Sequence, residues 1–207
     1  EKLVYGGLTK VFAGIVIAPI GGLIVGLLLT GLIITVFANR KPAPVNKIFG
    51  RLQIISSAWF ALTHGANDGQ KTMGIIALIL FSAGMIPELD IPLWVIFAAA
   101  AAMGLGTFFG GYKVIKTLGV KITRLRPYQG FAAETGGGLM LAAFAILGIP
   151  ASTTHAITGT IMGSGAARRK RAVRWKVSRQ IVFSWIITIP GAAGMGIGFT
   201  YLIHLFV

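Results

Sequence analysis

GIPASTTHAITG, residues 148–159, interrupts an otherwise apolar part of the chain. Gly148 and Pro150 end one helix, and the serine and threonines that follow can cap a new one. The second piece, which runs to Ala167, is too short to cross a bilayer fully. Because basic loops flank the two pieces on both sides, we expect a re-entrant hairpin whose tip, near 148–155, lies at membrane depth.

A second polar stretch, THGANDGQKTM at residues 63–73, lies in the middle of an apolar segment at 52–84. This segment is too long for one plain span, since about 20 residues cross the hydrocarbon. We therefore expect two helical pieces that meet at a break near 64–69. An ionisable side chain at the centre of a membrane helix costs about 2.5–3.5 kcal/mol, so the pattern indicates that Asp68 and Lys71 bind something.

The composition places the rest of the chain in a membrane. Of the 207 residues, 55% are hydrophobic and only 12% are charged, and the mean hydropathy is +0.82. These values lie outside the range of soluble domains and predict an all-α, polytopic protein of the cell membrane. Further apolar runs that can form spans lie at 11–37, 92–112 and 180–207, and the run at 129–149 is the first piece of the hairpin. The absence of cysteine excludes disulfides and thiolate metal sites.

The net charge of +14 would indicate nucleic acid in a soluble protein, but its distribution indicates a lipid bilayer. Most of the 19 Lys and Arg residues lie in three short loops, at 38–51, 113–127 and 168–179. That pattern is typical of cytoplasmic loops. An RNA-binding arm in the RRKR run would need an aromatic stacking module, which the sequence does not offer. We expect membrane lipid, and no nucleic acid, as a partner.

Two helix breaks in one membrane protein favour an ion site. Half-helix N-termini point N–H groups at an anion, and freed carbonyls hold a cation. The hydroxyls and N–H groups at residues 152–154 suit an oxyanion. Asp68 can accept a hydrogen bond from an anion that still carries a proton, which phosphate does at neutral pH and sulfate does not. The residues favour inorganic phosphate together with a small, hard cation.

Several polar residues have two interpretations. Lys71, three residues after Asp68, neutralises that carboxylate or the substrate, or it only pairs with Asp68 to hold two helices together. Glu134 is a cation ligand or a residue near the cytoplasmic interface. His64 and His155 are metal ligands or proton carriers, or they cap and orient a neighbouring turn.

A weak similarity between two segments of the chain predicts an internal repeat. FAGIVIAPIGGLIVG at 12–26 is similar to FSWIITIPGAAGMGI at 183–197. A repeat unit that ends in such a helix makes 1–37 the last transmembrane helix of a preceding repeat and 38–51 a basic cytoplasmic loop. Residues 52–207 are then a whole second copy. Since the chain does not begin with Met and has no signal peptide, we expect an internal start and a first copy that is mostly missing.

HGANDGQKTMGIIAL, RPYQGFAAETGG and GIPASTTHAITGTIMG closely resemble the inorganic phosphate transporter (PiT) family of secondary transporters, as does the closing VRWKVSRQIVFSWIITIP. The resemblance covers essentially the whole chain. It implies two inverted repeats, each with a broken helix and a hairpin, and this chain is similar to the C-terminal repeat. The implied partners are the N-terminal repeat half and, in a homo-oligomer, further copies.

The resemblance also implies site residues. The positions expected to line the phosphate site are Asn67, Asp68, Gln70, Lys71, Ser152, Thr153 and Thr154. Those expected to hold the coupling cation are Asn67, Asp68, Glu134 and Thr154. No catalytic residue, cofactor or further metal ion is implied.

We therefore expect a phosphate symporter that works by alternating access. Sodium is the first choice of coupling ion because oxygen ligands dominate. Protons carried by Asp68, Glu134 or a histidine are the alternative, as is co-transport of a metal–phosphate complex.

Two other classes of function compete with symport. His64, Asp68 and His155 could form the two-His-one-carboxylate site of an intramembrane phosphatase or metallohydrolase. The chain lacks an HExxH motif and a nucleophile beside a clear base, so we expect no enzyme. The other possibility is a structural or regulatory half that performs no transport of its own.

Overall fold

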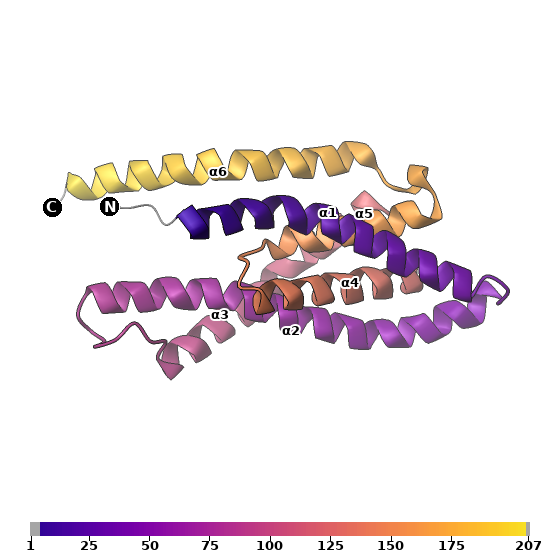
Figure 1. Cartoon of the computed structure of the whole chain (residues 1–207), viewed down its shortest axis with the longest axis horizontal. Helices are drawn as coiled ribbons and strands as arrows, with labels where there is room; N and C mark the ends of the chain where they lie inside the picture. Colours follow the sequence, from indigo (N-terminus) through magenta and orange to yellow (C-terminus); the bar gives the residue numbers. More distant parts are fainter. Residues whose placement is uncertain (1–4, 206–207) are drawn as a thin grey trace. The chain divides into compact units, whose positions relative to one another are not determined.

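A computed structural model describes residues 5–205, and all regular elements within that range are helical (Figure 1). In chain order they are α1 (Tyr5–Val36), α2 (Pro42–Ser82), α3 (Leu93–Lys116), the π-helical turn η1 (Thr117–Ile122), α4 (Pro127–Ile146), α5 (Thr153–Arg168), the 3₁₀ turn η2 (Lys170–Ala172) and α6 (Trp175–His204). The predicted all-α class is confirmed.

Within residues 5–205, three of the helical segments are long and apolar enough to cross a membrane. They are Gly6–Val36, Leu93–Ile122 and Trp175–His204. Each exceeds the ~20 residues that the hydrocarbon core requires. The chain is therefore a multi-pass membrane protein, as the composition predicts.

The prediction of a break near 64–69 is wrong, because α2 is one continuous helix of 41 residues. Its polar side chains bond to backbone atoms of the same helix and to neighbouring helices, so the backbone does not have to open. The helix also begins earlier than expected. Pro42 occupies its first turn, where the fixed φ of proline favours helix. The predicted loop at 38–51 is therefore short, and residues 42–51 belong to the start of α2.

A non-helical segment, residues 147–152, separates α4 from α5 at the place where the sequence predicts a hairpin tip. Gly148 has a φ of +59°, a left-handed conformation that glycine adopts readily at a helix C-terminus. Ser152 caps α5, because its Oγ accepts the backbone N–H of His155 at 3.4 Å. α4 and α5 pack against each other as a helical hairpin (Figure 1). Its depth in the bilayer stays a prediction.

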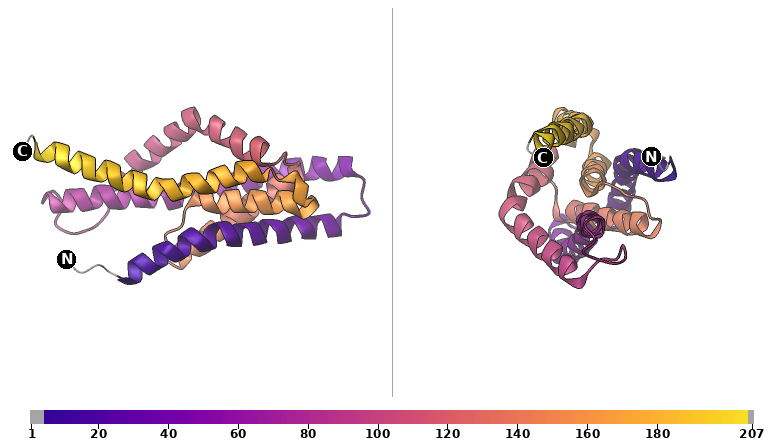
Figure 2. Two further views of the ribbon diagram at one scale, coloured as in Figure 1. Left: turned by 90° about the horizontal axis from the view of Figure 1, so that it is seen from above. Right: turned by 90° about the vertical axis from the view of Figure 1, so that its left-hand side faces the viewer.

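The hairpin packs between α1 and α2 (Figure 2). α1 packs against α5 and α4, and α4 also packs against α2. Glycines bring the backbones of α1 and α5 into contact, since a Cβ at Gly22 or Gly26 would overlap backbone atoms of α5. A Cβ at Gly159 or Gly163, on α5, would likewise overlap backbone atoms of α1. Small residues at such a crossing are the usual means of close helix packing in membranes.

The segment from Arg174 onward forms a second compact unit, which consists of α6. Pro190 lies inside this apolar helix, as Pro19 lies inside α1. These two prolines align in the sequence similarity between 12–26 and 183–197. Helix-interior proline is tolerated in membrane helices because neighbouring groups satisfy the freed carbonyl.

Candidate site at the junction of α2 and the hairpin

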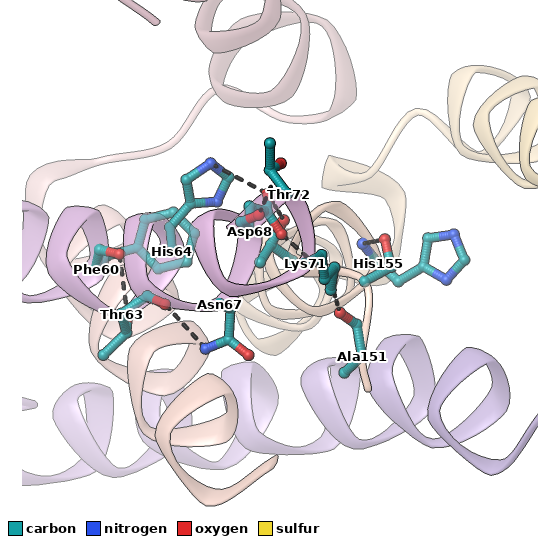
Figure 3. A network of polar contacts seen from close by, with 11 residues as sticks. Phe60, Thr63, His64, Asn67, Asp68, Lys71, Thr72, Ala151 and His155 are labelled. Atoms are coloured by element: carbon teal, nitrogen blue, oxygen red, sulfur yellow. Dashed lines mark hydrogen bonds and ion pairs between the residues drawn. The ribbon is translucent and has the colours of Figure 1, made fainter. Parts of the chain in front are cut away.

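The carboxylate of Asp68, on α2, lies at the first turn of α5 (Figure 3). Its Oδ2 accepts a hydrogen bond of 2.9 Å from Oγ1 of Thr153. The ammonium of Lys71 lies 3.2 Å from Oδ1 and also donates to the carbonyl oxygen of Ala151 at 2.8 Å. Nε2 of His64 is 3.6 Å from Oδ2. These five residues, which we call the Asp68 cluster, join the middle of α2 to the hairpin tip.

Helical spacing explains how α2 supplies three members of the Asp68 cluster. His64, Asp68 and Lys71 follow one another at intervals of four and three residues, so they share one face of a continuous helix. A break between them would have removed that alignment. The other two members come from the start of α5. Thr153 is its first residue, and Ala151 lies just before the cap, where its carbonyl is outside the helix.

Asn67 is next to Asp68 in sequence but points to another side of α2 (Figure 3). Its Nδ2 donates to the carbonyl oxygen of Thr63 at 2.9 Å and to that of Leu141, on α4, at 3.3 Å. The residue is only 8% exposed. The structure therefore places Asn67 in the contact between α2 and α4 and not in the Asp68 cluster.

The remaining residues of the predicted phosphate site surround the Asp68 cluster without joining it. Gln70 is exposed on α2, and Thr154 is exposed on the first turn of α5. Ser152 is half-buried, and its hydroxyl accepts the N–H of His155. Of the three hydroxyl residues at 152–154, Thr153 is the one that donates to Asp68 within residues 5–205.

Glu134, on α4, belongs to a separate group and contacts the N-terminal half of α2. Its Oε2 accepts a hydrogen bond of 2.6 Å from Ser56, and its Oε1 accepts one of 3.3 Å from Nε2 of Gln53. We call these three residues the Glu134 cluster. Ser56 precedes Asp68 by 12 residues, which is about 18 Å along a helix. The residues predicted to hold one cation are therefore divided between two places.

Gln53 and Ser56 were missed by the sequence analysis. They lie in LQIISSAWF, where two polar side chains three residues apart share a helix face within an apolar run. That spacing was a usable signal. The absence of a side chain at Gly130, on α4, leaves space for Gln53, because a Cβ there would overlap the Gln53 amide.

The two-His-one-carboxylate site of the enzyme hypothesis is not assembled. His64 lies near Asp68, but the ring of His155 is directed away from that carboxylate (Figure 3). Within residues 5–205, no group of three His, Asp or Glu side chains could hold a metal ion. The backbone N–H of His155 donates to the hydroxyl of Ser152, the cap of α5, and the role of the imidazole stays a prediction.

The Asp68 cluster combines a carboxylate, an ammonium, a hydroxyl and a backbone carbonyl. The side chain of Asp68 is 30% exposed and that of Lys71 is 46% exposed, so a ligand can reach both. The nearby N-terminus of α5 favours negative charge. This set of groups can hold an oxyanion and a cation side by side.

Comparison with known proteins agrees with this chemistry. The profile of the Phosphate transporter family matches residues 35–196. A probable low-affinity inorganic phosphate transporter of Rhizobium meliloti is 49% identical over 194 residues, which cover 93% of this chain and 58% of the relative. One of the same name from Bacillus subtilis is 39% identical over 193 residues, which cover 93% of this chain and 58% of that protein.

A solved structure described as "The sodium-dependent phosphate transporter" is similar in fold as well. The TM-score is 0.63 at 26% sequence identity, and the match covers 88% of this chain and 56% of that one. The chain thus spans less than two thirds of the length of these relatives. Because the family profile matches residues 35–196, the chain belongs to the phosphate transporter family.

Proposed function

We propose that the complete protein moves inorganic phosphate across the cell membrane together with a cation, by alternating access around the Asp68 cluster. The observation that carries this proposal is the bond from Thr153 to Asp68, which joins an acid in the middle of α2 to the tip of a helical hairpin. The relatives' names, inorganic phosphate transporters in two bacteria, support the choice of substrate.

Phosphate suits the donors and acceptors at the α2–α5 junction. Ser152, Thr153 and Thr154 supply hydroxyls, and the N-terminus of α5 supplies N–H groups. Gln70 adds an amide, and the ammonium of Lys71 offsets the negative charge of Asp68 beside the anion. Asp68 accepts the proton of hydrogen phosphate, whereas sulfate would place unprotonated oxygens against that carboxylate. The site therefore selects phosphate over sulfate.

Sodium is the proposed coupling ion, because carboxylate, hydroxyl and backbone carbonyl oxygens, the ligands that a hard cation prefers, occur in both clusters. At the hairpin, the ammonium of Lys71 offsets the charge of Asp68, and Asn67 lies apart in the contact between α2 and α4. Glu134 offers a second, separate carboxylate. Symport with protons, or of a metal–phosphate complex, would use the same phosphate site with a different cation. The word sodium in the name of the similar solved structure supports the choice.

Uptake of radiolabelled phosphate into proteoliposomes that carry the full-length protein tests this function. An imposed sodium gradient is compared with an imposed proton gradient, for the wild type, for Asp68→Asn and for a control at the exposed Lys113 of α3, Lys113→Gln. We expect uptake driven by sodium, lost in Asp68→Asn and retained in Lys113→Gln. Uptake driven only by protons would reassign the cation.

Unchanged uptake in Asp68→Asn would overturn the proposed mechanism. It would agree instead with a structural or regulatory half whose transport site lies elsewhere. Release of phosphate from an ester by the same vesicles would support the enzyme hypothesis.

A further inference from the structure

Lys71 holds its ammonium between two oxygens of different origin. One is Oδ1 of Asp68, at 3.2 Å, and the other is the carbonyl oxygen of Ala151, at 2.8 Å. A carboxylate together with a backbone carbonyl freed by a helix break is the ligand set that transporters offer to a sodium ion. Here the positive charge that these oxygens surround belongs to the protein itself.

We propose that Lys71 is a tethered cation that takes the place of one transported cation at Asp68. The inference rests on the proposed function, because it concerns how that site is neutralised. It assigns Lys71 a role in setting the number of cations that accompany each phosphate.

The second contact of Lys71 separates this role from that of an ordinary helix ion pair. A pair three residues apart on a helix contributes little and needs no further partner. Lys71 in addition bonds to Ala151, 80 positions along the chain, and Ala151 is only 3% exposed. The ammonium is therefore fixed at the hairpin tip by a tertiary contact.

Charge balance at Asp68 leads to the same conclusion. The other carboxylate oxygen, Oδ2, takes the neutral hydroxyl of Thr153. Nε2 of His64 lies 3.6 Å from the same oxygen, and the ammonium of Lys71 balances the negative charge at Oδ1, 3.2 Å away. A sodium ion at the same oxygens would lie within a few ångströms of that ammonium, and like charges at such a distance repel each other. Removing the ammonium should create a need for a mobile cation at this position.

The test uses the full-length protein in proteoliposomes and compares Lys71→Gln with Lys71→Arg and with Lys113→Gln as control. Initial rates of phosphate uptake are measured against sodium concentration, with N-methyl-D-glucamine as the replacement cation. For Lys71→Gln we expect the Hill coefficient for sodium to rise by about one. At the sodium concentration that half-saturates the wild type, the uptake rate of Lys71→Gln should fall about tenfold, because one charge-assisted hydrogen bond is lost. Saturating sodium should restore the rate.

Lys71→Arg keeps the charge and should retain the sodium dependence of the wild type, as should Lys113→Gln. If Lys71→Gln does not fold, Lys71→Met, which keeps the apolar stem, takes its place, and thermal melting in detergent reports folding in each case. Loss of uptake that no sodium concentration restores in a folded variant would make Lys71 a phosphate ligand and overturn the proposal.

Two further outcomes would also overturn it. A lower half-saturating sodium concentration with an unchanged Hill coefficient would mean that Lys71 competes with sodium. A changed Hill coefficient in Lys71→Arg would mean that charge is not the relevant property. If the wild type takes up no phosphate under any gradient, the proposed function itself fails, which the wild-type arm shows separately.

Discussion

Two carboxylates lie at α2, that of Asp68 on the helix itself and that of Glu134, which reaches it from α4. They differ in how their charge is balanced. Asp68 lies beside an ammonium of its own helix and receives a hydroxyl from the hairpin. Glu134 receives one hydroxyl and one amide, both neutral. We propose from this difference that Asp68 is balanced within the chain, whereas Glu134 binds the coupling cation. On this account the two clusters have different tasks, phosphate at the first and the coupling cation at the second.

The largest effect should come from Asp68→Asn. The substitution removes the negative charge and one of the two oxygens that accept from Thr153 and Lys71, and it leaves the ammonium without its carboxylate. Leaving a charged partner unpaired in this way costs a large part of the binding free energy. We expect phosphate uptake to fall at least about 100-fold, a little under 3 kcal/mol. Residual uptake within twofold of the wild type would remove Asp68 from the transport site.

Glu134→Gln should act on the cation and leave phosphate recognition intact. The amide keeps partners for Ser56 and Gln53 but loses the negative charge. We expect the half-saturating sodium concentration to rise about tenfold, while the half-saturating phosphate concentration at saturating sodium stays within about twofold. Sodium titrations of uptake measure the first quantity and phosphate titrations the second. A larger effect on phosphate than on sodium would contradict the division between the clusters.

Gly163→Ala tests whether the hairpin must be held closely against α1. A Cβ at Gly163 would overlap the carbonyl oxygen of Leu23, so the two helices would have to move apart. Overpacking of this kind costs about 1–3 kcal/mol. We expect a lower midpoint of thermal unfolding in detergent. Gly31→Ala, on α1, is the matched control, because no atom lies within 4 Å of its added Cβ. Equal midpoints for the two variants would contradict this packing.

Ser152→Ala should have the smallest effect. It removes the cap of α5, whose hydroxyl accepts the N–H of His155, and lost caps cost about 1 kcal/mol. We expect a modest drop in the thermal midpoint. Phosphate affinity should also fall, by several-fold, if the hydroxyl contacts substrate. Ser57→Ala, which loses only a bond within α2, is the control. A drop in the thermal midpoint without any change in phosphate affinity would restrict Ser152 to capping.

Sequence reasoning predicted much of the α2–hairpin junction. The proline and glycine at 148–150 predicted where α4 ends, and the hydroxyl residues after them predicted where α5 begins. The cost of burying charge indicated that Asp68 and Lys71 have partners. Those partners, Thr153 and the carbonyl of Ala151, lie at the other polar stretch.

The errors of the sequence analysis have a common origin in tertiary contacts. A polar stretch inside a long apolar segment is compatible with a broken helix and with a continuous one whose polar face is covered. The spacing of His64, Asp68 and Lys71 favours the continuous helix, but the contact with α5 that satisfies this face cannot be read from α2 alone. Likewise, the height at which α4 lies along α2 places Glu134 at Ser56 and not at Asp68. The position of α4 along α2 depends on close packing, for example at Gly130, where a Cβ would overlap the amide of Gln53.

Equilibrium binding of radiolabelled phosphate to the purified full-length protein tests the central claim most directly. The wild type, Asp68→Asn and Glu134→Gln are compared at saturating sodium. The account predicts that Asp68→Asn loses phosphate binding while Glu134→Gln keeps the affinity of the wild type within about twofold. Phosphate binding that survives in Asp68→Asn and is lost in Glu134→Gln would reverse the two assignments and contradict the account.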